Sequence, residues 1–386
     1  MAVHEHRATQ VIGVGSPTVK PHRSRRPLLA AIGGIALVLA VVVGSALANQ
    51  LSLWNTAASA SPRVATPGAR LTTVAEFPVG TFLEDLVVRE DGSMLITDLH
   101  KKQLWYLPAP TPGALAEPRL VYTFDAPPFD IQEGERDVFY VDAANYLTSH
   151  DSFLYRVDLR GWQPGMPAPV SNILKFPFPV TSANGSSFLA PDVLLVADSM
   201  LGLIWRVDLS DGGTKASASV WLRDPTMSPN PITYFGQHKV QPGVNGLEYA
   251  TKTHYLYYTA SATRMFMRVR VDPETLRPVG SPERVASGYQ WDDFDIDENA
   301  GVAYITTHRD NSIERVPLDP SGGQSAETVA GRPFNPLLAG PSDFAWGPNA
   351  SDYGSVAYMT SDGGYTAPPA DGIVRTAKVL RVDLAG

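Results

Sequence analysis

Four polar side chains occupy matching places in the chain and together could hold a metal ion. Each precedes an apolar, strand-like run by about eight to eleven residues, and they are Glu84, Asn184, Asn245 and Asp292. Two carboxylates and two amide carbonyls offer only oxygen ligands, which suits Ca²⁺ with water completing its roughly six to eight ligands. Zinc is less suited, because the chain has no cysteine and no paired-histidine motif.

These side chains can share a site only if the runs that follow them are equivalent units of one structure. The runs start roughly 45–60 residues apart, which is typical of a four-stranded propeller blade. There are six of them: Ser93–Asp98, Asp137–Asp142, Val193–Asp198, Tyr255–Ala260, Val302–Thr307 and Val356–Ser361.

A second short sequence motif recurs after most of these runs, with a similar spacing along the chain. The copies are Arg156–Leu159, Arg206–Leu209, Arg270–Pro273 and Arg381–Leu384, with a looser one at Arg315–Asp319. Since no long run has helical periodicity, residues 71–386 are predicted to form an all-β, six-bladed propeller. We expect Leu71–Phe77 to pair with the last blade and close the ring.

In a propeller the innermost strands line the central channel. If the recurring runs are those strands, the polar residues before them meet at one mouth of the channel. Asp292 is the contribution of the fifth unit; the second unit offers Asp130 or Gln132, and the sixth offers Asp343.

The N-terminal part has a different character. Residues 1–26 form a polar tail that ends in a basic cluster, residues 27–48 are uncharged, and residues 49–70 resemble a linker. The uncharged segment is long enough to span a bilayer, and the basic cluster predicts that the N-terminus stays cytoplasmic. It is either a type II signal anchor or a signal peptide cleaved after Ala48. Both alternatives place the propeller in the secretory pathway, lumenal or outside the cell.

Composition narrows the classes of partner. The net charge of −8 disfavours nucleic-acid binding, and the absence of cysteine excludes disulfides and thiolate chemistry. The predicted partners are a small-molecule substrate and, through the N-terminal segment, a membrane; the protein is expected to be a monomer. A glycan is predicted on the sequon at Asn349, but not on the one at Asn184, because a glycan does not fit in a channel.

Further candidates surround the channel. His308 follows the fifth run and is a candidate general acid or base. A substrate pocket could be shaped by aromatic residues on channel-side loops, namely Tyr234, Phe235, Trp291 and Tyr365. Histidines that merely end a strand and aromatics that lie in the core are the common alternatives.

The motifs around the four polar residues resemble those of the gluconolactonase, regucalcin (senescence marker protein) and diisopropyl fluorophosphatase group of six-bladed propellers. The similar strings are Leu83-Glu84-Asp85-Leu86, Ala183-Asn184-Gly185, Val244-Asn245-Gly246-Leu247 and Asp292-Asp293-Phe294. The resemblance covers about residues 72–386. It implies that Glu84, Asn184, Asn245 and Asp292 bind a central divalent metal. The family aspartate usually precedes glycine, so Asp293 is an alternative to Asp292.

Three functions follow from this resemblance. The first is a calcium-dependent hydrolase of a lactone, ester or organophosphate, with activated water or Asp292 as the attacking or basic group and His308 as a proton carrier. The second is a hetero-Diels-Alderase, since some propellers of fungal secondary metabolism resemble this chain. The third is a lumenal propeller that binds without catalysis.

Overall fold

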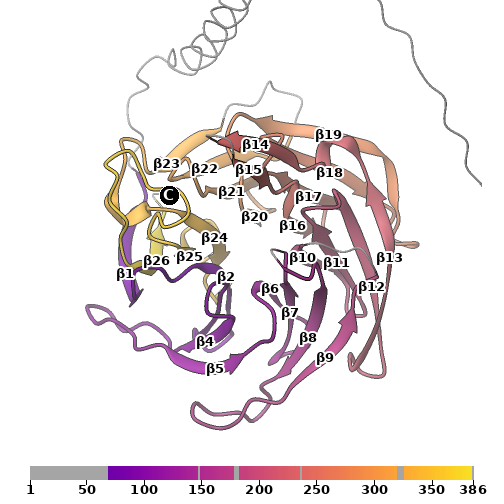
Figure 1. The fold of residues 1–386 in the computed structure, drawn as a ribbon, viewed down its shortest axis with the longest axis horizontal. Helices are drawn as coiled ribbons and strands as arrows, with labels where there is room; N and C mark the ends of the chain where they lie inside the picture. The colour runs from indigo at the N-terminus through magenta and orange to yellow at the C-terminus, as the bar shows by residue number, and fades with distance from the viewer. Residues whose placement is uncertain (1–67, 147, 178–181, 235–236, 320–325, 385–386) are drawn as a thin grey trace, which may run out of the picture. The chain divides into compact units, whose positions relative to one another are not determined.

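The computed structural model describes residues 68–146, 148–177, 182–234, 237–319 and 326–384. Within them, six four-stranded antiparallel sheets surround a central axis as the blades of a propeller (Figure 1). Strands follow one another through turns, as expected of a chain in which Gly and Pro are frequent and evenly spread. The predicted all-β, six-bladed propeller is confirmed.

Each of the first three blades consists of four consecutive strands, of which the first is innermost. Blade 1 contains β2 (Leu83–Val88), β3 (Met94–Asp98), β4 (Gln103–Leu107) and β5 (Arg119–Thr123). Blade 2 contains β6 (Pro128–Glu133), β7 (Val138–Ala144), β8 (Ser152–Asp158) and β9 (Val170–Lys175). Blade 3 contains β10 (Ala183–Ala190), β11 (Val193–Asp198), β12 (Leu203–Ser210) and β13 (Lys215–Arg223).

The last three blades follow the same order, except that the final one borrows a strand. Blade 4 contains β16 (Val244–Ala250), β17 (Tyr255–Ala260), β18 (Met265–Val271) and β19 (Pro278–Ser287). Blade 5 contains β20 (Phe294–Asp297), β21 (Val302–Thr307), β22 (Ser312–Pro317) and β23 (Glu327–Ala330). Blade 6 contains β24 (Pro341–Trp346), β25 (Val356–Ser361), β26 (Ala377–Asp383) and β1 (Arg70–Phe77).

A few short elements lie between the blades. A hairpin of β14 (Asn230–Tyr234) and β15 (Gln237–Gln241) separates blades 3 and 4. Two 3₁₀ turns are η1 (Pro225–Met227) and η3 (Pro336–Leu338). None of the helices in the described residues is long and apolar enough to cross a membrane. The predicted tail, span and linker before residue 68 lie outside the described residues.

The ring closes as predicted. β1 pairs antiparallel with β26, from Arg70 opposite Asp383 to Phe77 opposite Ala377. The first strand of the propeller therefore completes the last blade, and its Val74 and Phe77 are buried in the cluster between blades 6 and 1.

The expected position of the recurring runs is wrong by one strand. They form the second strand of each blade, not the innermost one. Second strands such as β3, β11 and β21 are buried along their whole length, so they read as continuous apolar runs. The innermost strands carry polar residues that face the channel, so they do not form continuous apolar runs. The polar residues therefore lie on the innermost strands themselves.

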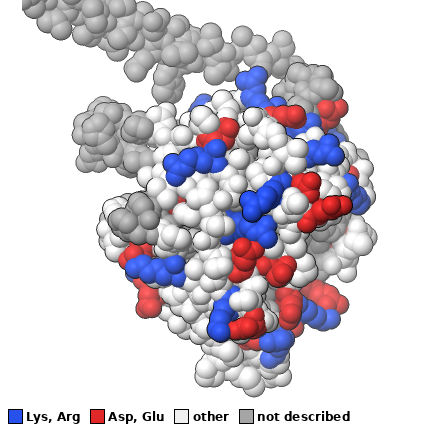
Figure 2. All heavy atoms as spheres, turned by 90° about the vertical axis from the view of Figure 1, so that its right-hand side faces the viewer, with Lys and Arg blue, Asp and Glu red and all other residues white. Residues whose placement is uncertain are grey.

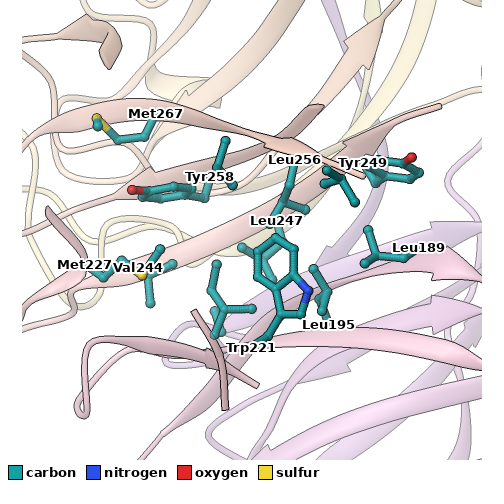
Figure 3. Close-up of a cluster of buried hydrophobic side chains, with 14 of the residues drawn as sticks. Leu189, Leu195, Trp221, Met227, Val244, Leu247, Tyr249, Leu256, Tyr258 and Met267 are labelled. Atoms are coloured by element: carbon teal, nitrogen blue, oxygen red, sulfur yellow. The ribbon is translucent and has the colours of Figure 1, made fainter. Parts of the chain in front are cut away.

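Hydrophobic clusters join neighbouring blades throughout the described ring. Figure 3 shows the cluster between blades 3 and 4, where Trp221 and Leu195 of one blade face Val244 and Tyr258 of the next. Each fully buried large side chain contributes about 1.5–3 kcal/mol. This packing fixes the position of each innermost strand relative to its neighbours.

The second recurring motif is structural. It ends the third strand of a blade, and in three copies its arginine pairs with the aspartate two residues later: Arg156 with Asp158, Arg206 with Asp208 and Arg381 with Asp383. The outer face shown in Figure 2 carries cationic and acidic side chains close together. Strands on this side include the ion pairs Lys215–Asp211 and Arg268–Glu283.

Candidate metal and active site

Residues at the start of the innermost strands form two successive layers along the channel. In five blades the pairing of the first and second strands shifts register at this place, which marks a β-bulge. Aligned on that shift, the upper layer contains Glu84, Phe129, Asn184, Asn245, Asp292 and Ser342. The lower layer contains Asp85, Asp130, Gly185, Gly246, Asp293 and Asp343.

This alignment corrects the expectation for the second and sixth units. The equivalents of Glu84 in those blades are Phe129 and Ser342, so Asp130, Gln132 and Asp343 do not belong to the upper layer. Asp343 instead accepts a hydrogen bond from the backbone of Leu86 in blade 1, at 3.0 Å.

Hydrogen bonds order the two asparagines of the upper layer. The Asn184 amide nitrogen donates to Ser199 Oγ at 3.0 Å. The Asn245 amide nitrogen donates to Ser261 Oγ at 3.1 Å and to Asp292 Oδ1 at 2.6 Å. Since the nitrogens are engaged, the amide oxygens remain free to bind a cation. Asn184 is buried, 5% exposed; the absence of a glycan on its sequon stays a prediction.

The two carboxylates of the upper layer are electrostatically strained. Glu84 Oε2 and Asp292 Oδ2 are buried and have no hydrogen-bond partner. Burial, and next the charge of Asp292, raise the pKa of Glu84 well above its ordinary value. Burial raises the pKa of Asp292 to about 6, although His308 and Asn245 act to lower it. Buried, unpaired carboxylate oxygens are costly, and a bound cation would offset that cost.

The glycines after the two asparagines permit close approach between blades. A Cβ atom on Gly185 would lie 2.5 Å from the backbone oxygen of Asn245, and one on Gly246 would collide with Asp293 Oδ1. Both glycines lie in strands, β10 and β16, rather than in turns. Asn-Gly pairs often mark tight turns, but these two pairs lie inside strands.

Threonines of the second strands hold the upper layer across the blade boundaries. Thr259 Oγ1 in blade 4 donates to the Asp292 carbonyl at 2.6 Å, and accepts from Gly246 N at 2.9 Å. Thr360 Oγ1 in blade 6 donates to the Glu84 carbonyl at 3.2 Å. The recurring run thus positions ligands of its own blade and of the next.

His308 lies beside the upper layer. Its Nδ1 is 3.8 Å from Asp292 Oδ2, and its Nε2 is 3.1 Å from Asp362 Oδ2. Burial alone would lower the pKa of His308, but Asp362 and then Asp292 raise it. Burial alone would raise the pKa of Asp362, yet His308 and Thr366 bring it down to about 2.

An aromatic wall occupies the other side of the mouth. Phe82, Leu99 and Phe129 pack together with Tyr146, and the Phe82 ring lies 5.2 Å from that of His308. Burial raises the pKa of Tyr146, and the negative charge of nearby Glu84 raises it further. The mouth therefore combines an oxygen-rich half with an apolar half.

The lower layer leads into a second acidic space. Asp85 accepts from the backbone of Ile131 at 2.9 Å, and Ser186 donates to Asp130. Below them a cavity of about 310 Å³ is lined by the carboxylates of Asp85, Asp130, Glu248, Asp293, Asp295 and Asp343. Asp293 belongs to this space, so Asp292 is the residue of blade 5 in the upper layer.

The four aromatic residues predicted to shape a substrate pocket have different surroundings. Tyr365 is half exposed at the mouth, where its ring lies 5.1 Å from His100. Trp291 is fully buried against Tyr289 in the core between blades 4 and 5, so it supports Asp292 from behind and does not line a pocket. Tyr234 ends β14, but its side chain, like all of Phe235, lies outside the described residues.

Asn349 lies on an exposed turn, where its amide nitrogen donates to Asp352 at 2.9 Å. The glycan predicted at this residue stays a prediction.

Sequence reasoning missed Asp362 and the aromatic wall. Asp362 directly follows the sixth recurring run, as His308 follows the fifth, so the repeat itself could have drawn attention to it. Phe129 could have been found by aligning blade 2 with Glu84 in blade 1.

The upper layer fits a hard divalent cation. Its donors are two carboxylates and two amides, and both carboxylates have an unpaired oxygen. Among the described residues no group of three or more His, Cys, Asp or Glu is arranged to hold a metal ion. A site here consequently depends on the asparagines.

Comparisons of structure support the fold. The chain is similar to a luciferin-regenerating enzyme, with 15% identity, 83% of this chain and 96% of that chain covered, and a TM-score of 0.56. It is similar to regucalcin from Agrobacterium tumefaciens, a calcium-binding protein, with 14% identity, 82% of this chain and 93% of that chain covered, and a TM-score of 0.55.

A third similar structure is the aldose sugar dehydrogenase from Streptomyces coelicolor in its PQQ-bound form, with 12% identity, 83% and 100% covered, and a TM-score of 0.53. No protein-family model matches the sequence, and no curated protein matches it either. At these identities the likeness concerns the propeller fold, which the predicted family shares.

Proposed function

We propose that this propeller is a calcium-dependent hydrolase of a lactone, ester or organophosphate. The observation that carries the proposal is the upper layer, where half-buried Glu84 and buried Asp292 each have an unpaired, buried oxygen next to two oriented asparagines. Bound there, Ca²⁺ would supply a Lewis acid for a carbonyl or phosphoryl oxygen. The similar regucalcin is a calcium-binding protein, which supports this choice of ion.

The chain's own residues would handle the proton and the apolar part of the substrate. Asp292 and His308 lie side by side at the mouth, so either can receive a proton from an attacking water. Phe82, Phe129 and Tyr146 offer an apolar surface to the rest of the substrate. We also retain as proposals the secretory location, the membrane attachment through residues 27–48 and the monomeric state.

The test compares wild type with Asp292→Asn by calorimetric Ca²⁺ titration and by hydrolysis of a panel of lactones and esters. The amide keeps the oxygen that accepts from Asn245 and replaces the unpaired one, so the fold should survive. We expect Ca²⁺ affinity to fall by at least roughly 100-fold and turnover to vanish. Asp272→Asn, on an outer turn of blade 4, is the matched control and should change neither quantity.

Unchanged hydrolysis in Asp292→Asn would refute the assignment. Turnover that resists chelators and yields no hydrolysed product would instead favour the hetero-Diels-Alderase alternative, for which the aromatic wall is the favourable observation. Ligand binding without turnover of any kind would favour the non-catalytic propeller.

A further inference from the structure

Asp362 is a buried carboxylate at the channel mouth, and it has no role in the proposed binding of calcium or in the proposed proton transfer. It is fully buried and follows β25. Its Oδ1 accepts from Gly364 N at 2.6 Å. Its Oδ2 accepts from Thr366 N at 2.9 Å and from Thr366 Oγ1 at 2.6 Å. The loop that contains Asp362 thus fixes both of its oxygens.

Blade 6 also fixes the backbone of Asp362 from the opposite side. Its N–H donates to the carbonyl of Gly340 at 2.9 Å. Gly340 has a positive φ of 64°, and a Cβ atom there would collide with Asp362 Oδ1. The carboxylate is therefore held in one position before any ligand arrives.

This carboxylate contacts one ring nitrogen of His308. The distance from Nε2 to Asp362 Oδ2 is 3.1 Å, whereas Nδ1 is 3.8 Å from Asp292 Oδ2. Thr366 Oγ1 also lies 3.1 Å from Nε2, and its hydroxyl donates to Asp362 Oδ2. An ionised carboxylate only accepts, and the hydroxyl hydrogen of Thr366 is already used, so these contacts favour a hydrogen on Nε2. The Phe82 ring, 5.2 Å away, closes one side of the imidazole. Nδ1 is then the nitrogen that faces Asp292 and the upper layer.

We propose that Asp362 is a positioning residue, which fixes the ring orientation and the Nε2–H tautomer of His308 and thereby presents Nδ1 to the substrate. The arrangement has the logic of an Asp–His pair in which the aspartate orients the imidazole without reacting. The catalytic consequence rests on the proposed hydrolase function, whereas the tautomer does not.

The first experiment measures the tautomer and needs no activity. Long-range ¹H–¹⁵N spectra of the histidine rings are recorded on the full chain with excess Ca²⁺, and the loss of signals in His308→Ala assigns His308. We expect an Nε2–H pattern in wild type and in Asp362→Asn, whose oxygen can still accept, but a mixed pattern in Asp362→Ala. Asp371→Ala, which removes an exposed ion pair with Arg375 on the same loop, is the matched control and should match wild type.

The second experiment is a double-mutant cycle on hydrolysis of p-nitrophenyl acetate and δ-valerolactone. We expect Asp362→Ala to lower kcat by roughly 100-fold with little change in KM, and Asp362→Asn to recover part of the loss. In a His308→Ala background Asp362→Ala should have almost no further effect, because both substitutions remove one unit.

Two results would overturn the proposal. One is an unchanged Nε2–H pattern in folded Asp362→Ala. The other is the same loss of kcat from Asp362→Ala with and without His308, which would show that the aspartate only supports its loop. If wild type hydrolyses nothing, the proposed function fails, while the tautomer result still decides whether Asp362 orients His308.

Discussion

Two neighbouring aspartates in blade 5 have different surroundings. Asp292 is hydrogen-bonded to Asn245 and faces Glu84 and His308. Asp293 lies in the lower layer, against the backbone of Gly246 and among the carboxylates of the cavity. Both residues directly precede β20, and although they are consecutive they lie in different layers.

The carboxylates of the lower layer predict how stability depends on pH. Burial raises the pKa of Asp130 to about 6, even though hydrogen bonds from Asp85 and Ser186 lower it; the unfolded value is about 3.9. Between these values the folded chain holds the proton more tightly than the unfolded chain. The contribution of Asp130 to the free energy of unfolding is therefore fully present below about pH 4 and is lost as the pH rises through about 6.

Asp130→Asn tests this, because its amide imitates the protonated acid beside Asp85. We expect the free energy of unfolding of wild type to fall between pH 4 and pH 7. The fall in the variant should be smaller than the fall in wild type, and the difference should be on the order of a few kcal/mol. Urea unfolding across this range gives the comparison. Asp211→Asn, on an exposed turn, should follow wild type; equal slopes for all three chains would contradict the prediction.

At the scale of elements, the second strands connect the blades to the site. Thr259 of β17 bonds the backbone on both sides of the boundary between blades 4 and 5, at Gly246 and Asp292. These contacts join the asparagine and the aspartate of the upper layer through one hydroxyl. The affinity of the site should therefore depend on a residue that is not one of its ligands.

Thr259→Val removes both hydrogen bonds with little change in volume. We expect a loss of about 1–3 kcal/mol in stability and roughly 10–100-fold weaker Ca²⁺ binding, measured by thermal unfolding and calorimetry. Thr328→Val is the control, since it removes a hydroxyl whose single hydrogen is shared between the two carboxylate oxygens of Glu314 within blade 5. The control should lose stability while it keeps its Ca²⁺ affinity. An equal loss of affinity in both variants would contradict a specific role of Thr259 in the site.

The elements also show what the sequence could and could not reveal. The repeat, the ring closure and four of the six residues of the upper layer follow from spacing, because equivalent blades place equivalent residues at the axis. The innermost strands were harder, since strings such as Leu83–Val88 mix carboxylates with apolar residues. The contact between His308 and Asp362 joins two blades, and no local pattern predicts which side chains meet there.

At the scale of the whole molecule, stability depends on the closing strand. β1 contributes Val74, Ala75 and Phe77 to the core between blades 6 and 1 and covers the edge of β26. Burial of the two larger side chains alone is worth about 1.5–3 kcal/mol each, against a total of roughly 5–15 kcal/mol for a domain. An uncovered edge also favours association between chains.

A chain that begins at Pro78 should therefore be less stable than one that begins at Gly68. We expect its melting temperature to be lower by at least roughly 10 °C, and its elution in size-exclusion chromatography to shift toward aggregates. Addition of a peptide with the sequence of residues 68–77 should restore part of the loss. Equal melting temperatures for the two chains would show that the pairing of β1 with β26 is dispensable.

The pairing of β1 with β26 also sets an order of events during synthesis. Of the described strands, β1 leaves the ribosome first, whereas its partner β26 (Ala377–Asp383) leaves last. At ordinary elongation rates the interval is on the order of tens of seconds. For that time the strand has no edge to join, and Glu84 of blade 1 cannot lie next to Asp292 of blade 5 in a closed ring. The nascent propeller is thus exposed to aggregation until β26 emerges, and only then can the upper layer assemble.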